Sequence, residues 1–588
     1  MTDNKNLILA IALSVLVVIG YSMFIEQPRQ LAEQQRQAAL QAETQTATNQ
    51  GTAPAPGISG GVTAPSGAPV MPATIIPDVA ESRAAALAES PRITIKAPSV
   101  TGSIALKGAR IDDVVLSNYR ETLDPASPPI HLFEPTALRK PYYAEFGWVT
   151  APNTPVKLPT ADTVWIADKT LLEPGTPVTL RWDNGEGLTF ERRIALDEEY
   201  LFTVTQTVRN ASKAAVTLYP YGLLSRGGTP SILGFYILHE GPLGVFDETL
   251  KEIDYSDLQE DGDIKVASQG GWIGLTDKYW LAALIPGKDG RWDYNFRHTI
   301  RNQDDRYQVD FLGQPETVAA GALATAESRL FAGAKLVSLL DRYADEYGIT
   351  NFDLAIDFGW FYFLTKPFFF ILNYFNSVLG NFGLAILALT VVIKLLFFPL
   401  ANKSYRSMAK LKTLTPKMKE MREKYGDDRQ RLNEEMMAMY KREKVNPAAG
   451  CLPILIQIPV FFSLYKVLFV NIEMRHAPFY GWVKDLSAPD PTTLFNLFGL
   501  IPWTPPELLM IGAWPVIMGI TMFLQQKLNP QPADPVQAKV FMFLPLLFTV
   551  LLSQFAAGLV IYWTWNNLLS ILQQWVIMKR MGVKNTLS

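Results

Sequence analysis

The class of this chain is decided by its last apolar stretch, VFMFLPLLFTVLLSQFAAGLVIYWTWNNLLSILQQWVIM, which runs from Val540 to Met578 without a charged residue. It is about twice as long as the roughly 20 apolar residues that a transmembrane helix needs. No polar loop divides it, so we predict spans at 540–556 and 557–578, with Ala556-Ala557-Gly558 as the turn between them. The chain is therefore expected to cross a membrane as a helical hairpin near its C-terminus.

Four further apolar stretches, at 7–25, 377–400, 449–470 and 511–526, bring the predicted number of spans to six. The stretch 7–25 holds 19 uncharged residues. A cleaved signal peptide would have a shorter apolar core followed by a small-x-small site. Here the run ends in Glu26-Gln27-Pro28-Arg29, so we favour an uncleaved anchor over residues 1–26.

The overall composition excludes several functions. The 588 residues carry 53 Lys+Arg against 56 Asp+Glu, a net charge of −3, which argues against a protein built mainly to bind DNA. The single cysteine, Cys451, excludes an internal disulfide and a thiolate metal cage. The four histidines share no ligand-like spacing, so we predict neither a metal nor a cofactor; they are His131, His239, His298 and His476.

Two different segments separate the anchor from the C-terminal spans. Residues 27–91 are rich in Gln, Ala, Thr, Pro and Gly and are predicted to be a flexible linker. Residues 92–335 hold short alternating runs with polar turns between them, which predicts an antiparallel β-sandwich; the clearest runs are 178–182, 188–194, 200–208 and 215–221. No catalytic motif occurs there. Its tryptophans could line a carbohydrate groove, but core packing is the favoured reading of Trp165, Trp182, Trp272 and Trp280.

Residues 336–376 are predicted to form helices, first 336–347 and then an aromatic helix that lies on the membrane surface. The segment 358–375 holds ten aromatic residues in 18 and is interrupted by Lys366-Pro367. Such aromatic density is typical of a membrane–water interface.

Charge predicts the orientation. The 401–448 loop holds 13 Lys/Arg and seven Asp/Glu, whereas the 471–510 loop has only Arg475 and Lys484 as cations. The positive-inside rule places the 401–448 loop and the tail 579–588 in the cytoplasm. Six spans then place the N-terminus there too, with the β-domain and the 471–510 loop on the far side.

The 401–448 loop is predicted to be an antiparallel coiled-coil hairpin that turns at 426–428. Its apolar repeat comprises Met408, Leu411, Thr415, Met418, Arg422, Tyr425, Leu432, Met436 and Met439. A purely structural hairpin is one reading. Methionine, however, adapts to varied apolar partners, which favours capture of a substrate; six of the 16 methionines lie here, at 408, 418, 421, 436, 437 and 439. The basic surface would also suit lipid headgroups or ribosomal RNA.

Polar side chains inside the predicted spans indicate a water-filled cavity within the membrane. Lys394 and Lys466 are the only charges within the six spans, and no acid accompanies them. Lys466 lies near a span end and can snorkel; snorkelling is also the alternative for Lys394, which would otherwise cost up to about 3 kcal/mol in lipid. A polar stripe along 557–578 favours the cavity. The stripe consists of Trp563, Asn567, Ser570 and Gln574, and Gln457 adds a polar group from 449–470.

These segments together resemble the YidC membrane-protein insertase family. The resemblance rests on Asn381-Phe-Gly, Lys394-x4-Pro399-Leu400, Ser407-Met-Ala-Lys410, Asn446-Pro447-x2-Gly450-Cys451-x-Pro453-x3-Gln457-x-Pro459 and Gly558-Leu-Val-x-Tyr562. The order of anchor, periplasmic β-domain, interfacial helix and five-helix core matches the Gram-negative members. The strong motif matches cover about residues 358–581.

The resemblance implies an inner-membrane insertase and chaperone, not an enzyme, which acts alone or with the Sec translocon and uses no cofactor. It implies a hydrophilic groove, open to cytoplasm and lipid, with Lys394 at its centre where the family usually has arginine. Polar groove positions match Gln457, Asn567 and Ser570, and an apolar slide matches Phe461 and Tyr562. Since no acid lies in the spans, we expect Lys394 to be paired in the resting state with water and with polar groups such as Asn567 and Gln457. Nascent inner-membrane proteins would be the substrates, captured by the hairpin methionines (Met408, Met418, Met421, Met436 and Met439), with the lipid bilayer and the ribosome as further partners.

Two other functions would require different sequence features or partners. A secondary transporter would need ion-coupling carboxylates at the midplane and inverted repeats, and the spans contain neither. A scaffold that tethers envelope proteins through the β-domain would bind periplasmic partners and no nascent chains. We therefore expect an insertase.

Overall fold

The computed structural model describes residues 80–580 except 81, 152–155, 232–237, 289, 302, 427, 444, 446–451, 504, 507–508 and 530–534. The predicted anchor, 1–26, lies outside the described residues, as do most of the predicted linker and the end of the tail.

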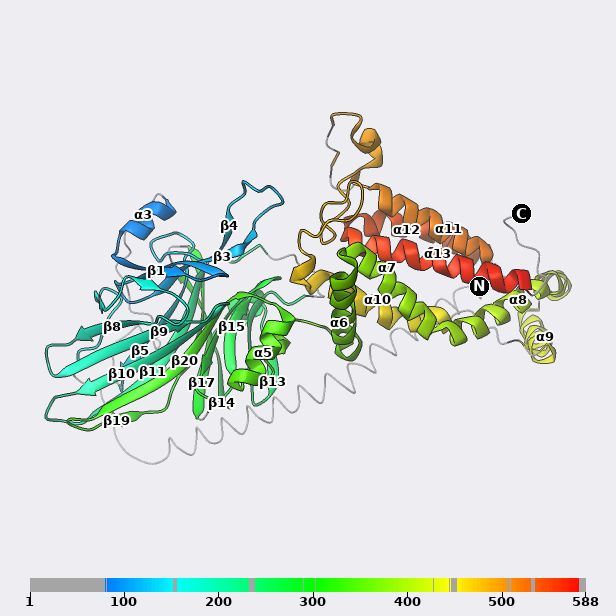
Figure 1. The fold of residues 1–588 in the computed structure, drawn as a ribbon. Helices are drawn as coiled ribbons and strands as arrows, with labels where there is room; N and C mark the ends of the chain where they lie inside the picture. Colours follow the sequence, from blue (N-terminus) through cyan, green and yellow to red (C-terminus); the bar gives the residue numbers. More distant parts are fainter. Residues whose placement is uncertain are drawn as a thin grey trace, which may run out of the picture. The chain divides into compact units, whose positions relative to one another are not determined.

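The N-terminal half of the described chain is a β-sandwich of two sheets (Figure 1). One sheet has the order β14 (Ile264–Gln269), β17 (Arg291–Arg301), β18 (Asp304–Leu312), β11 (Val216–Gly227), β5 (Tyr142–Thr150), β3 (Ile111–Arg120), β2 (Val100–Ala105), β1 (Arg92–Lys96) and β7 (Leu171–Leu172). β19 (Glu316–Val318) pairs with β11, and β4 (Pro129–Phe133) pairs with β3.

The second sheet has the order β13 (Thr249–Glu252), β12 (Gly241–Phe246), β15 (Trp272–Thr276), β16 (Trp280–Pro286), β20 (Leu323–Ala334), β10 (Leu201–Asn210), β9 (Leu188–Leu196), β8 (Val178–Asp183) and β6 (Ile166–Ala167). The alternating pattern explains these strands, because the period of two turns one face inward. In β9, Leu188, Phe190, Ile194 and Leu196 are buried, and Ile194 lies opposite Val204 of β10. The prediction of an antiparallel sandwich is confirmed.

The tryptophans belong to the core rather than to an open groove. Trp272 is fully buried and Trp165 is 4% exposed. Trp182 and Trp280 are partly buried and pack against the same hydrophobic cluster. Core packing, the favoured reading of these residues, is therefore confirmed.

The end of the predicted linker is ordered. Residues Arg83–Ala88 form helix α3, and Arg83 forms ion pairs with Asp113 and Glu134 of the β-domain. These ionic partners are remote in sequence, which is why composition alone assigned the segment to the linker.

Helix α5 (Val337–Tyr347) and the short 3-10 helix η2 (Phe352–Ala355) connect the β-domain to α6 (Tyr362–Leu379). A further helix, α4 (Tyr255–Asp261), follows β13. Lys366 of α6 binds Asp341 at 3.0 Å and Asp353 at 2.8 Å, which ties α6 to both preceding helices. Some aromatic residues around α6 are strongly exposed, with Trp360 at 88% and Phe363 at 69%, whereas Phe368 and Phe369 are buried. This exposure suits the predicted surface-lying helix.

The remaining helices form a bundle and a hairpin (Figure 1). They are α7 (Phe382–Leu396), α8 (Phe398–Tyr425), α9 (Arg429–Arg442), α10 (Leu452–Val470), α11 (Ala513–Leu528), α12 (Pro535–Leu551) and α13 (Ala557–Arg580). Two helices do divide the apolar run 540–578, but the turn predicted at 556–558 was placed too late. Helix α12 ends at Leu551, the 3-10 turn Leu552–Gln554 follows, and α13 already begins at Ala557.

The predicted span 377–400 is broken. Helix α7 ends at Leu396, and α8 starts at Phe398 with Pro399 in its first turn. Pro399 has no N–H to donate to the Leu395 carbonyl, and its ring would clash with that carbonyl in a continuous helix, which accounts for the break. Among the described residues no single helix meets a length-and-apolarity criterion for crossing a membrane, whereas α7 and Phe398–Leu414 meet it together across a 69° bend. The count of six spans is thus not confirmed.

Lys466 does not snorkel toward water. Its Nζ lies 2.6 Å from a carboxylate oxygen of Asp357, and its side chain is 11% exposed. Asp357 lies between η2 and α6. The sequence did not indicate this partner, because the two residues are far apart in the chain and Asp357 lies outside the predicted spans.

Candidate functional site

The candidate site forms where α7 meets α13. Asn381 caps α7, its side chain accepting a hydrogen bond from the Leu384 N–H at 3.1 Å. Lys394 lies in the last turn of α7, not six residues inside a longer span. A cation near a helix C-terminus interacts favourably with the unpaired carbonyls there.

Lys394 is held by a neutral group. Its Nζ donates to Ser570 Oγ at 2.7 Å, and Ser570 Oγ donates in turn to the Asn566 carbonyl at 2.8 Å. Ser570 is 2% exposed. Among the residues that the structure describes, no Asp or Glu forms an ion pair with Lys394. The lysine therefore occupies a half-buried position without a counter-charge.

The polar stripe of α13 contacts two different helices. Asn567 Nδ2 donates to Thr521 Oγ1 of α11 at 3.2 Å, and Gln574 Nε2 donates to Asn529 Oδ1, just after α11, at 3.0 Å. Ser570 instead reaches α7. We expected Asn567 and Gln457 to be partners of Lys394, and this expectation was wrong, because Asn567 faces α11 and Gln457 faces a tyrosine.

Gln457 and Tyr562 join α10 to α13. Gln457 Nε2 donates to Tyr562 Oη at 2.6 Å, and Tyr562 is only 2% exposed. The Phe461 ring lies 4.7 Å from that of Trp563 and is partly buried. Phe461 is therefore the more accessible of the two predicted slide residues, whereas Tyr562 is buried.

Two polar positions escaped the sequence reasoning. Thr521 of α11 and Asn529, which directly follows that helix, both bond to the α13 stripe. Thr521 is a lone hydroxyl within the apolar run AWPVIMGITMFL, a signal that could have pointed to it.

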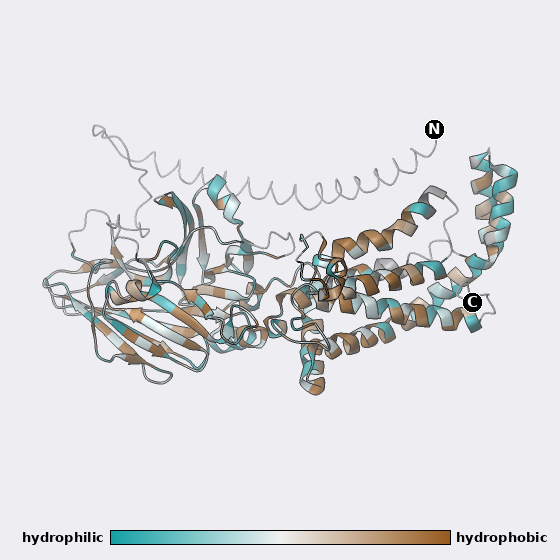
Figure 2. Cartoon of the chain, turned by 90° about the horizontal axis from the view of Figure 1, so that it is seen from above, coloured by the Kyte–Doolittle hydropathy of each residue, from teal (hydrophilic) through white to brown (hydrophobic). Residues whose placement is uncertain are grey.

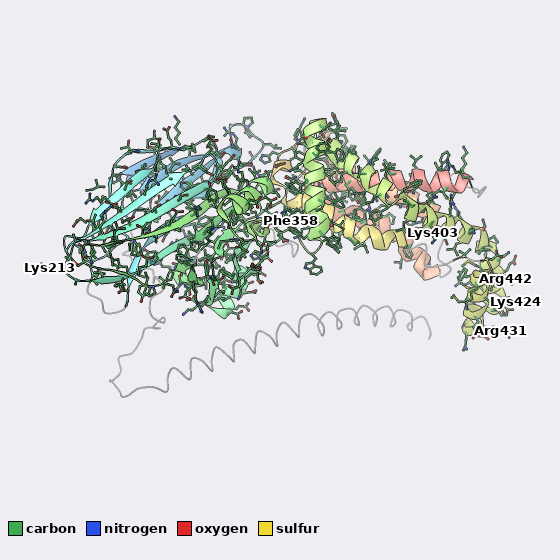
Figure 3. The ribbon with its side chains drawn as sticks, turned by 60° about the horizontal axis from the view of Figure 1, so that its bottom comes forward. Lys213, Phe358, Lys403, Lys424, Arg431 and Arg442 are labelled. Atoms are coloured by element: carbon green, nitrogen blue, oxygen red, sulfur yellow. The ribbon has the colours of Figure 1, made fainter. Side chains whose placement is uncertain are left out.

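The hairpin of α8 and α9 is the second candidate element. Tyr440 Oη lies 3.6 Å from Met418 Sδ, and Lys417 pairs with Glu443 at 3.2 Å. Met439 is buried, and Met418, Met421 and Met436 are partly exposed. Its surface is hydrophilic in contrast to the apolar bundle (Figure 2) and carries Lys424, Arg431 and Arg442 (Figure 3).

Met408 differs from the other hairpin methionines. It is 7% exposed and packs with Tyr405 and with Ile577 of α13. The neighbouring Ala409 packs with Leu528 and Met578. The start of α8 is therefore anchored to the bundle, and the prediction that Met408 belongs to the hairpin seam was wrong.

Comparison with known proteins gives consistent matches over the whole chain. The family model described as the YidC periplasmic domain matches residues 92–371, and that described as the 60Kd inner membrane protein matches residues 374–584. A protein named "Membrane protein insertase YidC" from Bradyrhizobium diazoefficiens is 53% identical over 603 residues, covering 99% of this chain and 97% of its own length.

A protein of the same name from Methylobacterium radiotolerans is 51% identical over 600 residues, covering 99% of this chain and 96% of its own. Among solved structures, one described as an active YidC insertase with the first transmembrane domain resolved is 16% identical, covering 82% of this chain and 92% of its own, with a TM-score of 0.34.

Proposed function

This chain belongs to the YidC family of membrane protein insertases, and from that premise we propose that the Lys394–Ser570 site receives the polar part of a substrate. The protein is an inner-membrane insertase, its substrates are membrane proteins, and it works in contact with lipid. Its relatives are named as insertases rather than as catalytic enzymes. The proposal concerns how its own residues carry out insertion.

The observation that carries the proposal is a half-buried cation with a neutral, buried partner. Lys394 donates to Ser570 Oγ, and no described carboxylate pairs with it. A hydroxyl satisfies one hydrogen bond but leaves the charge uncompensated. An incoming acidic or strongly polar segment could supply the missing partner, and burial of its apolar segment in lipid would then drive release.

The site shortens the polar path through the membrane. Moving a polar tail across about 30 Å of hydrocarbon is prohibitive, because each unpaired polar group costs several kcal/mol. Asn567, Gln574 and Gln457 continue the row of polar side chains from Ser570 along α13 and α10, and in the structure they bond to neighbouring helices. In the proposal these groups form a hydrophilic groove open to cytoplasm and lipid, and Phe461 with Tyr562 forms the apolar slide beside it.

The α8–α9 hairpin is proposed to capture the substrate first. Its partly exposed methionines, Met418, Met421 and Met436, offer adaptable apolar contacts within a basic surface. Met439 is buried between the helices and would become available if the hairpin opened. The Sec translocon and the ribosome are the proposed partners that deliver nascent chains.

The proposed orientation follows the charge distribution. The hairpin and both termini would face the cytoplasm, and the β-domain and the 471–510 loop would face the periplasm. An accessibility assay with a membrane-impermeant thiol reagent on single-cysteine variants would test each of these placements separately.

Site-specific crosslinking tests the groove. A photoreactive amino acid is placed at Lys394, at Tyr562 or, as a control, at Lys213, an exposed residue of a β-domain turn. Each variant is exposed to ribosome-stalled nascent membrane proteins of increasing length. The proposal expects adducts from positions 394 and 562 over a defined range of lengths and none from 213. Adducts from 213 alone would instead favour the scaffold function.

A further inference from the structure

The loop between α10 and α11 ends in an apolar tip, Leu494–Trp503. Leu500 is 83% exposed, and the exposure of the other large apolar side chains lies between 43% and 52%. Those side chains are Leu494, Phe495, Leu497, Phe498, Ile501 and Trp503. So many large apolar groups on one short segment form a contiguous patch of the kind that marks a binding surface.

Hydrogen bonds fix the residues at both ends of the tip. Asp490 is 3% exposed and accepts hydrogen bonds from Trp482 Nε1 at 3.1 Å and from the Trp514 N–H at 2.9 Å. Thr493 Oγ1 donates to the Leu509 carbonyl at 2.9 Å, and the Leu494 N–H donates to the Ile511 carbonyl at 2.9 Å. The apolar side chains are thus presented by a folded loop.

The tip carries no charge. From Pro491 to Pro506 the chain contains no Asp, Glu, Lys or Arg, whereas Asp490 and Glu507 flank this stretch. Trp503 and two phenylalanines lie within it. An uncharged segment with aromatic residues is typical of the boundary between headgroups and acyl chains.

The loop lies next to an apolar outer surface of the bundle. The loop leaves the C-terminal end of α10, whereas the α8–α9 hairpin joins its N-terminal end, so the two lie at opposite ends of the bundle (Figure 1). Helix α11 follows directly and exposes Ile517, Ile520 and Phe523. The apolar tip therefore continues the apolar exterior of a protein that works in lipid.

We propose that the tip inserts into the leaflet at the end of the bundle away from the hairpin and contacts acyl chains. Two alternative occupants, a second copy of this chain and a substrate segment, would also bury apolar side chains. The continuity with α11 and the absence of charge favour lipid, because a bilayer offers an apolar layer without any need for complementary charges.

Fluorescence quenching in proteoliposomes tests the proposal. In a chain lacking its one cysteine through Cys451→Ser, a nitrobenzoxadiazole dye is attached at Leu500→Cys or Ile501→Cys. The control is Lys484→Cys, an exposed position in the same loop. The vesicles contain phosphatidylcholine and phosphatidylglycerol, with or without phosphatidylcholine carrying a nitroxide on its acyl chain. Iodide in the aqueous phase serves as a second quencher, and every measurement is made first without substrate and then with a substrate added.

The proposal expects lipid-borne nitroxide to quench the dye at 500 and 501 at least twice as strongly as the dye at 484, independently of the protein-to-lipid ratio. Equal quenching at all three positions would overturn it. Shielding from aqueous quencher that disappears on twentyfold dilution of protein in lipid would indicate a second copy instead. Shielding that arises only when a substrate is added would indicate a substrate contact.

Discussion

Lys394 of α7 and Ser570 of α13 are joined by a hydrogen bond of 2.7 Å between Nζ and Oγ. The bond connects two helices that are 176 residues apart at these positions, and it pairs a cation with a neutral hydroxyl. A hydrogen bond to a charged group stabilises by about 1.5–3 kcal/mol, less than the desolvation of a fully buried charge costs. The pair is thus suited to exchange Ser570 for a carboxylate when one arrives.

The Gln457–Tyr562 pair should be energetically coupled. Gln457→Leu leaves the buried tyrosine hydroxyl without its partner, and Tyr562→Phe leaves the amide without its acceptor, so each should destabilise the bundle by about 1–3 kcal/mol. The double variant should lose less than the sum, with a coupling of about 1 kcal/mol. Denaturation in detergent measures this cycle.

A second cycle provides the control for this coupling. Gln574 lies 12 residues beyond Tyr562 on α13, about 18 Å along the helix. Gln457→Leu combined with Gln574→Leu should be additive within about 0.5 kcal/mol. If the Gln457→Leu and Tyr562→Phe changes were additive as well, the hydrogen bond between Gln457 and Tyr562 would contribute nothing to stability.

Removal of the hairpin should abolish capture and spare the bundle. Met408 and Ala409 pack against the bundle, so a deletion of Lys410–Arg442 bridged by a Gly-Ser linker keeps these anchors. The remaining helices should integrate into the membrane and unfold at a similar temperature, whereas insertion of a simple substrate should fall at least tenfold. Insertion at the wild-type rate would contradict the capture role.

The β-domain should be largely dispensable for insertion. Deletion of residues 92–335 removes every strand from β1 to β20, while the polar cluster around Lys394 lies wholly outside it. We expect the truncated protein to retain at least half of the insertion rate for a small substrate in reconstituted vesicles. Complete loss of insertion by a truncated protein that is still stable in the membrane would count against this separation.

Lys335 should make the stability of the β-domain depend on pH. It is buried, and desolvation lowers its pKa from 10.5 to about 8 while Nζ donates to Thr276 Oγ1 at 2.8 Å. Between pH 8 and 10.5 the unfolded chain binds more protons at this residue, so stability should rise with pH by up to about 1.4 kcal/mol per unit.

Below pH 8 both states are protonated, and this slope should vanish. Lys335→Met should remove the contribution between pH 8 and 10.5, as measured by denaturant unfolding of the full chain followed through β-domain fluorescence. An unchanged slope in the variant would show that other groups cause the pH dependence.

Local patterns predicted much of the fold, and long-range packing set the rest. The β9 and β10 strands follow from period-two alternation, and the apolar run 540–578 indicated two helices, although the turn lies at Leu552–Gln554 rather than at 556–558. The break at Phe397 had a local signal, since Pro399 follows, but the apolar run concealed it. The Lys466–Asp357 pair had none, because its partners are more than 100 residues apart.

The candidate site shows the same division. The polar stripe of α13 could be identified from its 4-3-4 spacing, but not which helix each side chain meets. Ser570 contacts α7 while Asn567 contacts α11, because the neighbouring helices pack on different sides of the stripe. The pairing of Lys394 with Ser570, rather than with Asn567 or Gln457, therefore required the three-dimensional structure.

The charge of Lys394 is the centre of the account, and three substitutions separate it from shape. Lys394→Arg keeps the charge, Lys394→Leu removes it, and Lys394→Glu reverses it. At an effective dielectric of about 20, a carboxylate at roughly 4 Å gains about 4 kcal/mol before desolvation, so an acidic tail should depend strongly on the cation. Both charges lose part of their hydration when they pair, and this cost offsets part of the gain. The contact between Lys394 and the tail should therefore be transient.

The decisive measurement is the insertion rate of one substrate, made with an acidic or an uncharged N-terminal tail, in vesicles containing each variant. For the acidic tail we predict a near-normal rate with Lys394→Arg, a clear loss with Lys394→Leu and the largest loss with Lys394→Glu. The uncharged tail should respond less to all three. Equal losses for both tails, or a normal rate of the acidic tail with Lys394→Glu, would contradict an electrostatic role for Lys394.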